Sequence, residues 1–209
     1  MGFYPVFIDL TGRLCVVVGG GPVAERRVDA LLTAGAGVTV VSPEVTSTLA
    51  ALASEGRIRH VARPYRPGDL AGAELVFTAV DDPAVSPAVA LEARERGVWL
   101  NAADEPAHCD FILPGLVQRG VLTIAVGSSG ASPALTRTLR EHLDTTVGHE
   151  WSVLGELAST ARRELRAAGR ATDGERWRRA LAADVRLLLA EGRVAEARYR
   201  LRTRLELPA

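Results

Sequence analysis

Residues 14–24 read Leu-Cys-Val-Val-Val-Gly-Gly-Gly-Pro-Val-Ala, an apolar run that ends abruptly in three glycines. An amphipathic stretch, residues 23–34, follows at once. This order predicts a buried strand, a tight turn and a helix. Gly19, Gly21 and Ala24 stand at the G-x-G-x-x-A spacing that is typical of dinucleotide-binding turns.

This spacing has a physical basis. Gly19 permits the sharp turn, Gly21 lets a pyrophosphate approach the backbone, and Ala24 lets the helix pack closely on the strand. The N–H groups of the first helical turn then face the phosphates, with the positive end of the helix dipole behind them. We therefore predict dinucleotide binding, and the competing interpretation is a glycine turn with a purely structural role.

The residues after the turn favour NAD as the dinucleotide. A second apolar stretch, residues 37–41, completes the unit. Glu44 lies about 20 residues past the motif, where an acidic residue commonly meets the adenosine ribose of NAD. No basic residue occurs at positions 42–55, whereas NADP usually needs an arginine for its extra phosphate.

Composition excludes several classes of function. The chain has 209 residues with 25 basic and 25 acidic side chains, so no net charge favours nucleic acid. It contains no lysine, which excludes a Schiff base, and its two cysteines make neither a disulfide framework nor a cysteine-rich zinc site. We see no signal peptide at the amino terminus and no apolar run of membrane-spanning length, so we expect a cytoplasmic protein without a membrane partner.

The chain pattern predicts an α/β protein with a Rossmann-like, doubly wound parallel sheet. Apolar strands and helices alternate through the first half. The predicted strands are residues 14–18, 37–41, 57–61, 75–79 and 98–101, and the predicted helices are residues 23–34, 46–55 and 83–96.

The pattern changes after Asn101. Residues 111–117 and 121–126 resemble an antiparallel hairpin. A Gly/Ser loop follows at 128–133, where Ser132 could cap a helix that runs to about residue 143. Residues 151–205 read as helical, with breaks near 169–174 and 192, and we interpret their dense arginines as a solvated face or, alternatively, a surface for a partner or substrate.

Six motifs follow one another along the chain. They are Phe3-Tyr4-Pro5-Val6-Phe7 with Asp9-Leu10 and Gly12; Gly19-Gly20-Gly21-Pro22-Val23-Ala24-Glu25-Arg26-Arg27; Thr78-Ala79-Val80-Asp81-Asp82; Asn101-Ala102-Ala103-Asp104; Phe111-Ile112-Leu113-Pro114; and Ser128 to Pro133 with Leu139-Arg140. Taken in order, these motifs resemble precorrin-2 dehydrogenase, the module of siroheme synthase that makes sirohydrochlorin. The resemblance covers about residues 3–145, and the helical tail is similar only in type.

The resemblance implies NAD-dependent oxidation of precorrin-2 to sirohydrochlorin. In some members it also implies insertion of ferrous iron, a substrate, to give siroheme. It further implies a homodimer, with an NAD-binding domain at 1–113, a dimerisation segment at 114–146 and a helical carboxyl-terminal domain at 147–209. Because the chain ends at Ala209, we expect a separate enzyme to supply precorrin-2.

The resemblance also assigns site residues. Asp104 matches the aspartate proposed as general base, a role that suits a carboxylate if partial burial raises its pKa. A turn or cap residue is the alternative for Asp104, and Glu105 is a neighbouring carboxylate that could be mistaken for the base. The residues expected to contact NAD are Gly19, Gly21, Pro22, Val23, Pro43, Glu44, Thr78 and Ala79.

Substrate contacts are expected further along the chain. Ser128 matches a family serine near the substrate, although a capping loop would explain it equally, and Ser129 stands where the family has glycine. Arg137 and Arg140 are expected to meet substrate carboxylates. Arg26 and Arg27 are further candidates, and any of these four arginines could be a plain surface residue.

We expect no resident metal. His108, Cys109 and Asp110 are adjacent, so their side chains would point in different directions, and we interpret His108 as a loop residue. Two other hypotheses stay open beside the dehydrogenase: a chelatase that has lost the dehydrogenase step, and a non-catalytic NAD-sensing regulatory module.

Overall fold

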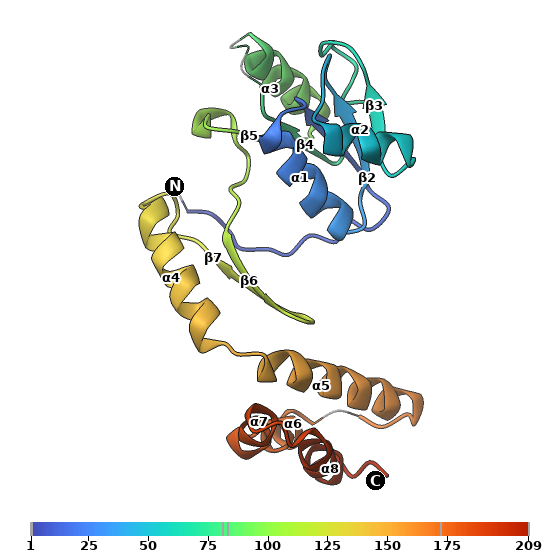
Figure 1. The fold of residues 1–209 in the computed structure, drawn as a ribbon, viewed down its shortest axis with the longest axis vertical. Helices are drawn as coiled ribbons and strands as arrows, with labels where there is room; N and C mark the ends of the chain where they lie inside the picture. The colour runs from blue at the N-terminus through green and yellow to red at the C-terminus, as the bar shows by residue number, and fades with distance from the viewer. Residues whose placement is uncertain (1, 81, 83, 172, 209) are drawn as a thin grey trace. The chain divides into compact units, whose positions relative to one another are not determined.

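The computed structural model describes residues 2–80, 82, 84–171 and 173–208. Asp81, which the sequence placed in a family motif, and Pro83, at the start of a predicted helix, lie outside the described residues. The chain divides into two compact units, Gly2–Ile112 and Leu113–Ala209 (Figure 1).

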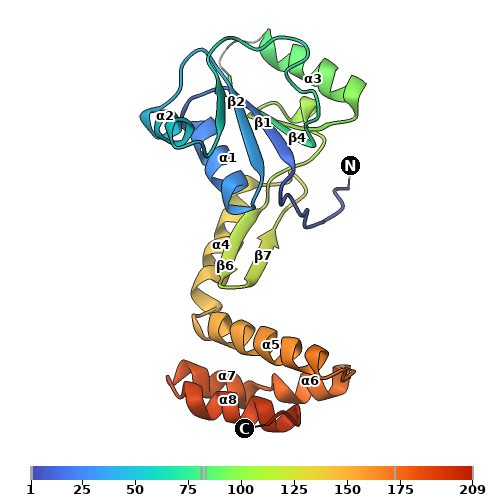
Figure 2. The same cartoon turned by 90° about the vertical axis from the view of Figure 1, so that its right-hand side faces the viewer.

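The first unit is a five-stranded parallel sheet in the order β3-β2-β1-β4-β5, which confirms the Rossmann-like fold class. Helices α1 and α2 pack on one face and α3 on the other (Figure 2). The strands are β1 (Leu14–Val18), β2 (Gly37–Val41), β3 (Arg59–Val61), β4 (Leu75–Thr78) and β5 (Trp99–Ala102). The helices are α1 (Pro22–Thr33), α2 (Ser47–Ser54), α3 (Val85–Arg96) and the short 3₁₀ turn η1 (Pro106–His108).

Strand β1 explains why this half of the sequence shows apolar runs instead of alternation. Its side chains point alternately to the two faces, and both faces are covered. Cys15 and Val17 enter the core beneath α1 and α2, whereas Val16 and Val18 enter the core beneath α3. All four are buried, so β1 is the centre of the unit.

Two strands begin two or more residues later than predicted, and the other predicted strands begin within one residue of the observed ones. Strand β3 begins at Arg59 and not at residue 57, because the N–H groups of Arg57 and Ile58 close the end of α2 on the carbonyl of Leu52. The predicted strand at 111–117 was also wrong at its start. Phe111 packs edge-on against Phe77, with 5.6 Å between ring centroids, and so belongs to the first unit.

The second unit opens with an antiparallel hairpin, β6 (Gly115–Arg119) and β7 (Leu122–Val126), followed by α4 (Pro133–Thr146). The predicted cap is confirmed, since Ser132 accepts a hydrogen bond from the N–H of Leu135 at 3.2 Å. Helix α4 continues beyond the predicted end near residue 143. Arg119 explains this, because its guanidinium donates to the carbonyls of Asp144 and Val147 at the helix end.

The rest of the second unit is helical, as predicted, and its helices share one apolar core. The predicted breaks are confirmed at Gly169 and Gly192, which both have positive φ. A further break at Leu181–Ala182 was not predicted. The helices are α5 (Glu150–Ala167), α6 (Gly174–Ala180), α7 (Ala183–Ala190) and α8 (Val194–Arg204).

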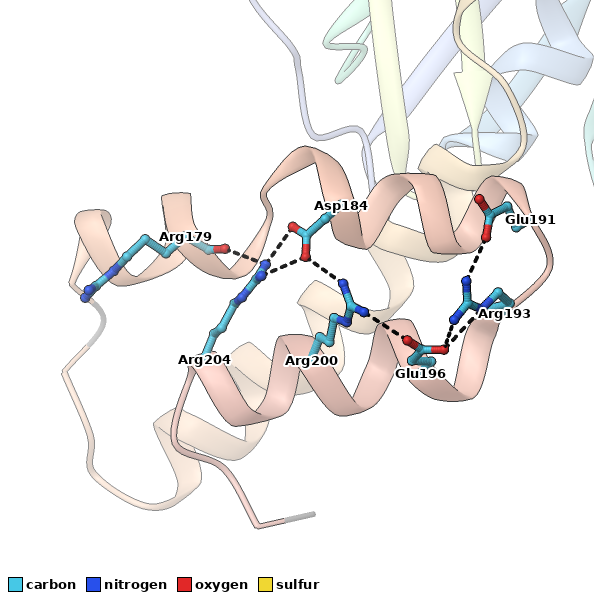
Figure 3. A network of polar contacts seen from close by, with 7 residues as sticks. All are labelled: Arg179, Asp184, Glu191, Arg193, Glu196, Arg200 and Arg204. Atoms are coloured by element: carbon cyan, nitrogen blue, oxygen red, sulfur yellow. Dashed lines mark hydrogen bonds and ion pairs between the residues drawn. The ribbon is translucent and has the colours of Figure 1, made fainter.

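The arginines of this region pair with acids between helices. Asp184 of α7 accepts from Arg204 at 2.7 and 2.9 Å and from Arg200 at 3.1 Å, so one carboxylate joins α7 to α8 (Figure 3). Arg204 and Arg200 hold the pKa of Asp184 well below its usual range. Much of the arginine density therefore serves packing within the unit.

Within the described ranges, no helix is both long and apolar enough to cross a membrane.

A buried carboxylate organises the α3 side of the first unit. Glu92 accepts from the N–H groups of Gly68 and Leu70, from the hydroxyl of Tyr65 and from Arg96 Nε at 2.6 Å. Burial raises the pKa of Glu92, but these donors outweigh it and leave the pKa below its usual value. The carboxylate thus ties the loop before β4 to α3.

We expect Glu92→Gln to lower the free energy of unfolding by about 2 kcal/mol at neutral pH, because it removes charge-assisted hydrogen bonds. Since the folded state lowers the pKa of Glu92, its contribution is complete above about pH 4.3, the ordinary pKa of glutamate. The contribution is lost as the pH falls through the folded pKa. Urea unfolding of both proteins near neutral pH and at about pH 3 measures this.

The exposed neighbour Glu95 provides the matched control, and Glu95→Gln should change stability by less than about 0.5 kcal/mol at either pH. Equal effects of the two substitutions, or a difference between Glu92→Gln and wild type that does not shrink in acid, would contradict this role for Glu92.

Candidate functional site

The parallel register brings the predicted cofactor residues of the first unit to one edge of its sheet. Val18 of β1 lies opposite Val41 of β2 and Thr78 of β4, and Thr78 lies opposite Ala102 of β5. The loops that leave these strand ends all emerge at the carboxyl edge, where ligands bind in open α/β sheets. Those loops carry Gly19, Gly21, Pro43, Glu44, Ala79 and Asp104.

Three backbone segments meet at the glycine turn. Gly19 has φ +118°, and a Cβ on it would lie 2.1 Å from the carbonyl oxygen of Ala79. A Cβ on Gly20 would lie 2.0 Å from the carbonyl oxygen of Glu44. The G-x-G-x-x-A spacing assigns no role to Gly20, yet its missing side chain lets the β2–α2 loop cross the turn.

Gly21 differs from its two neighbours. A Cβ on Gly21 would meet nothing within 4 Å, so its outer side is open. Gly21 is the N-cap of α1, and Pro22 occupies the first helical turn. Among the described residues, the N–H groups of Val23 and Ala24 have no acceptor. This open, N–H-lined helix start fits the pyrophosphate of a dinucleotide.

The predicted ribose contacts lie beside this turn. Pro43 and Glu44 are exposed on the β2–α2 loop. The hydroxyl of Ser42 donates to the carbonyl of Glu44 at 2.6 Å, and the N–H of Thr46 donates to the carbonyl of Gly20 at 3.0 Å. These bonds fix the loop against the glycine turn and leave the Glu44 side chain outside.

Thr78 has a structural position at the end of β4. Its hydroxyl lies 3.1 Å from the hydroxyl of Ser86 in α3, and its carbonyl accepts from the N–H of Ala103 at 2.9 Å. The side chain is buried, whereas Ala79 is partly exposed. A role for Thr78 in holding cofactor stays a prediction.

Asp104 sits on a loop that is pinned at its base. Asp110 accepts from the N–H of Leu100 at 2.9 Å, and Asn101 Nδ2 donates to the carbonyl of Phe111 at 2.9 Å. The Cys109 thiol contacts the N–H and carbonyl of Ala102, both at 3.2 Å. These contacts close the loop that carries Asp104. They come from the motif residue Asn101 and from Cys109 and Asp110, which were not expected to bind a metal.

Asp104 itself is strained and exposed. Its φ is +60°, a left-handed conformation that costs most side chains energy but that Asp and Asn tolerate. The Asp104 side chain is exposed, so the condition of partial burial is not met in this chain. Such a carboxylate is available to a ligand.

Glu105, the neighbouring carboxylate, is already engaged. Its Oε2 lies 2.9 Å from His108 Nδ1. Hydrogen bonding from Ser86 and His108 lowers the pKa of Glu105. His108, which lies in the short turn η1, is thus the partner of Glu105. In the part of the chain that the structure describes, no group of three or more His, Cys, Asp or Glu side chains could hold a metal ion.

The predicted substrate residues belong to the second unit. Ser128 donates to the carbonyl of Ser132 at 3.1 Å and accepts from Thr136 at 3.0 Å, so its hydroxyl braces the loop before α4. Ser129 has φ +52°, a left-handed conformation that favours glycine, which explains why the family has glycine at this position. On α4, Arg137 is exposed, whereas Arg140 packs its stem near Gly115 and its guanidinium lies 3.5 Å from Glu141.

Comparison with known proteins supports a dinucleotide-binding first unit. The model of a family described as putative NAD(P)-binding matches residues 6–115. Siroheme synthase of Methylobacillus flagellatus is 46% identical over 158 residues, which cover 76% of this chain and 34% of the relative. Siroheme synthase of Thioalkalivibrio sulfidiphilus is 38% identical over 208 residues, 99% of this chain and 42% of the relative. The chain thus spans less than half the length of these relatives.

A solved structure shares the fold. SirC, precorrin-2 dehydrogenase, superimposes with a TM-score of 0.76 over 96% of this chain and 100% of that one, at 24% identity. This similarity extends over both units and confirms the architecture.

The adjacent glycines allow stability and cofactor binding to be separated. We expect Gly20→Ala to lower the free energy of unfolding by about 2–3 kcal/mol, because its Cβ collides with the backbone of Glu44. Gly21→Ala should change stability by less than about 1 kcal/mol but weaken NAD binding at least about tenfold, since the methyl group covers the open helix start. Thermal unfolding and calorimetric NAD titration measure the two effects.

A Gly21→Ala protein that binds NAD as tightly as wild type would contradict the assignment of the pyrophosphate to this turn. Equal stability of the two variants would contradict the close approach at Gly20.

Proposed function

The chain belongs to the putative NAD(P)-binding family, and we propose that it is a precorrin-2 dehydrogenase, which oxidises precorrin-2 to sirohydrochlorin with NAD. One observation carries the proposal: a dinucleotide turn lies at the same sheet edge as an exposed carboxylate on a pinned loop, and this carboxylate has no partner among the described residues. The substrate class in this proposal follows from the resemblance of the chain to siroheme synthases.

The cofactor contacts that we propose follow from the geometry of this edge. The open side of Gly21 and the N–H groups at the start of α1 bind the pyrophosphate. Pro22 and Val23 form that start, and Pro43 with Glu44 lies toward the adenosine ribose. The acidic Glu44 supports NAD over NADP, because a 2′-phosphate would meet a negative charge. Thr78 and Ala79 complete the proposed contacts.

Asp104 is the general base in this proposal. The oxidation removes two electrons and two hydrogens from the macrocycle, one as a hydride and one as a proton. Bound NAD would supply the hydride acceptor. Asp104 accepts the proton, and its pinned loop holds the carboxylate without a competing partner among the described residues. The engaged Glu105 is the weaker candidate for this role.

The remaining assignments depend on the second unit. We propose Ser128, Arg137 and Arg140 as substrate contacts, the arginines for carboxylates of precorrin-2. Insertion of ferrous iron into the product stays a prediction, in which the Asp104 carboxylate would accept pyrrole protons. A cytoplasmic location stays a prediction.

The alternative is a non-catalytic NAD-sensing module. Such a module would need the glycine turn but has no use for the braced Ser128 loop or for a base held in a left-handed conformation. Turnover separates the two functions.

We expect Asp104→Asn to lower kcat/KM for precorrin-2 by about 10²–10⁴-fold while the Kd for NAD stays within about twofold of wild type. Asparagine tolerates the left-handed backbone, so the loop keeps its shape and only the base is lost. The assay is NADH formation under anaerobic conditions with enzymatically made precorrin-2.

Asp29→Asn, an exposed acid on α1, is the matched control and should keep wild-type turnover. Retention of more than about one tenth of activity by Asp104→Asn would exclude Asp104 as the base. A wild-type protein that binds NAD but forms no NADH would overturn the dehydrogenase and favour the sensing module.

We also propose a homodimer, supported by the apolar surface of α4. This helix has no buried residue in the single chain, and Leu135 and Leu139 are 59% and 44% exposed. They are four residues apart and so share one helix face. A two-stranded hairpin with one helix is marginal alone, and a second copy of the chain would cover this face. Tyr4 and Phe7 expose further apolar surface.

We expect the double substitution Leu135→Asp and Leu139→Asp to convert a dimer to a monomer, because it places charges in the proposed interface. Sedimentation analysis gives the mass directly. Leu187→Asp on α7, at a residue 54% exposed, is the control and should leave the dimer intact. A wild-type monomer at micromolar concentration, or a doubly substituted dimer, would refute the proposal.

A further inference from the structure

Arg27 of α1 has an unusual environment. Its guanidinium carbon lies 5.8 Å from the ring centroid of Phe77, over the aromatic face. Phe77 belongs to the central strand β4 and is fixed by its edge-on contact with Phe111. The ring therefore holds the guanidinium in place on the α1 side of the sheet.

The surroundings of Arg27 act against its positive charge. Burial lowers the pKa of Arg27 and the adjacent Arg26 lowers it further, whereas the charge of Asp104 opposes both. Within the described ranges, Arg27 makes no hydrogen bond or ion pair. Arg63 of the same unit, in contrast, pairs with Asp69 at 2.6 Å.

The geometry suits one kind of ligand. The contact with the Phe77 ring provides no acceptor for the N–H donors of the guanidinium, whose planar fork can bind a carboxylate through two parallel hydrogen bonds. A half-buried guanidinium without an acceptor is costly, and a bound anion removes that cost. Asp104 lies near enough for its charge to act on Arg27, so this anion would lie close to the proposed base.

We propose that Arg27 binds a carboxylate of the substrate and so orients the macrocycle against Asp104. The inference rests on the proposed dehydrogenase function and adds to it a binding residue in the first unit. A dinucleotide phosphate offers similar chemistry. The carboxylate is favoured because Arg27 lies over the Phe77 ring of β4, where the charge of Asp104 acts on it, whereas the open N–H groups for phosphate belong to Val23 and Ala24.

The test uses binding and turnover. Sirohydrochlorin, the proposed product, is the fluorescent probe for the substrate site, and NAD is titrated separately by calorimetry. We expect Arg27→Gln to weaken sirohydrochlorin binding and to raise KM for precorrin-2 about tenfold or more, with NAD affinity within about twofold of wild type. Arg27→Lys, which keeps the charge but loses the planar fork, should give an intermediate loss.

Arg94→Gln, at an exposed arginine near the end of α3, is the matched control and should behave as wild type. Thermal unfolding of each variant shows whether it is folded, and Arg27→Lys keeps the test valid if Arg27→Gln is unstable. Weakened NAD binding with unchanged sirohydrochlorin binding would assign Arg27 to a phosphate and overturn the proposal, as would indifference to both substitutions.

Failure of the proposed function gives a different result. In that case the wild-type protein would bind NAD but would neither bind sirohydrochlorin nor oxidise precorrin-2, and both proposals would fall together. Turnover by wild type with an unaffected Arg27→Gln variant would overturn the role of Arg27 alone.

Discussion

The close approach of three backbone segments at Gly19 and Gly20 is the constraint on which the site depends. The turn after β1 touches the carbonyl of Ala79 after β4 and the carbonyl of Glu44 after β2, at positions where no Cβ would fit. Because all three segments leave the same edge of a parallel sheet, this contact sets where the loops begin. The open helix start at Gly21 is a consequence of that turn.

Asp104 places an exposed carboxylate at the same edge of the sheet. The sheet supplies a rigid base, and the contacts of Asn101, Cys109 and Asp110 close the loop. A left-handed backbone then projects Asp104 away from the sheet while Glu105 is held by His108. Backbone strain of this kind is kept where the surrounding structure determines it, which is common at functional sites.

The two units differ in how much of their apolar surface is buried, and how many of their charged groups are paired, within the single chain. The first unit buries both faces of its sheet, and its buried carboxylate, Glu92, accepts hydrogen bonds from donors within the unit. The helices α5 to α8 likewise share a core and cross-helix ion pairs. Helix α4 buries no residue, which is why we assign its apolar face to a second copy of the chain.

The sequence by itself determined the parallel sheet, the glycine turn and the cap at Ser132, because apolar runs, glycine spacing and capping act locally. It missed the role of Gly20, the clamp at the base of the Asp104 loop and the start of the hairpin at Gly115. Each of these depends on contacts between residues that are distant in the chain or that share no periodic pattern. Only the tertiary structure decided which carboxylate stays available and that Arg27 stacks on Phe77, since packing and backbone strain are set by the whole fold.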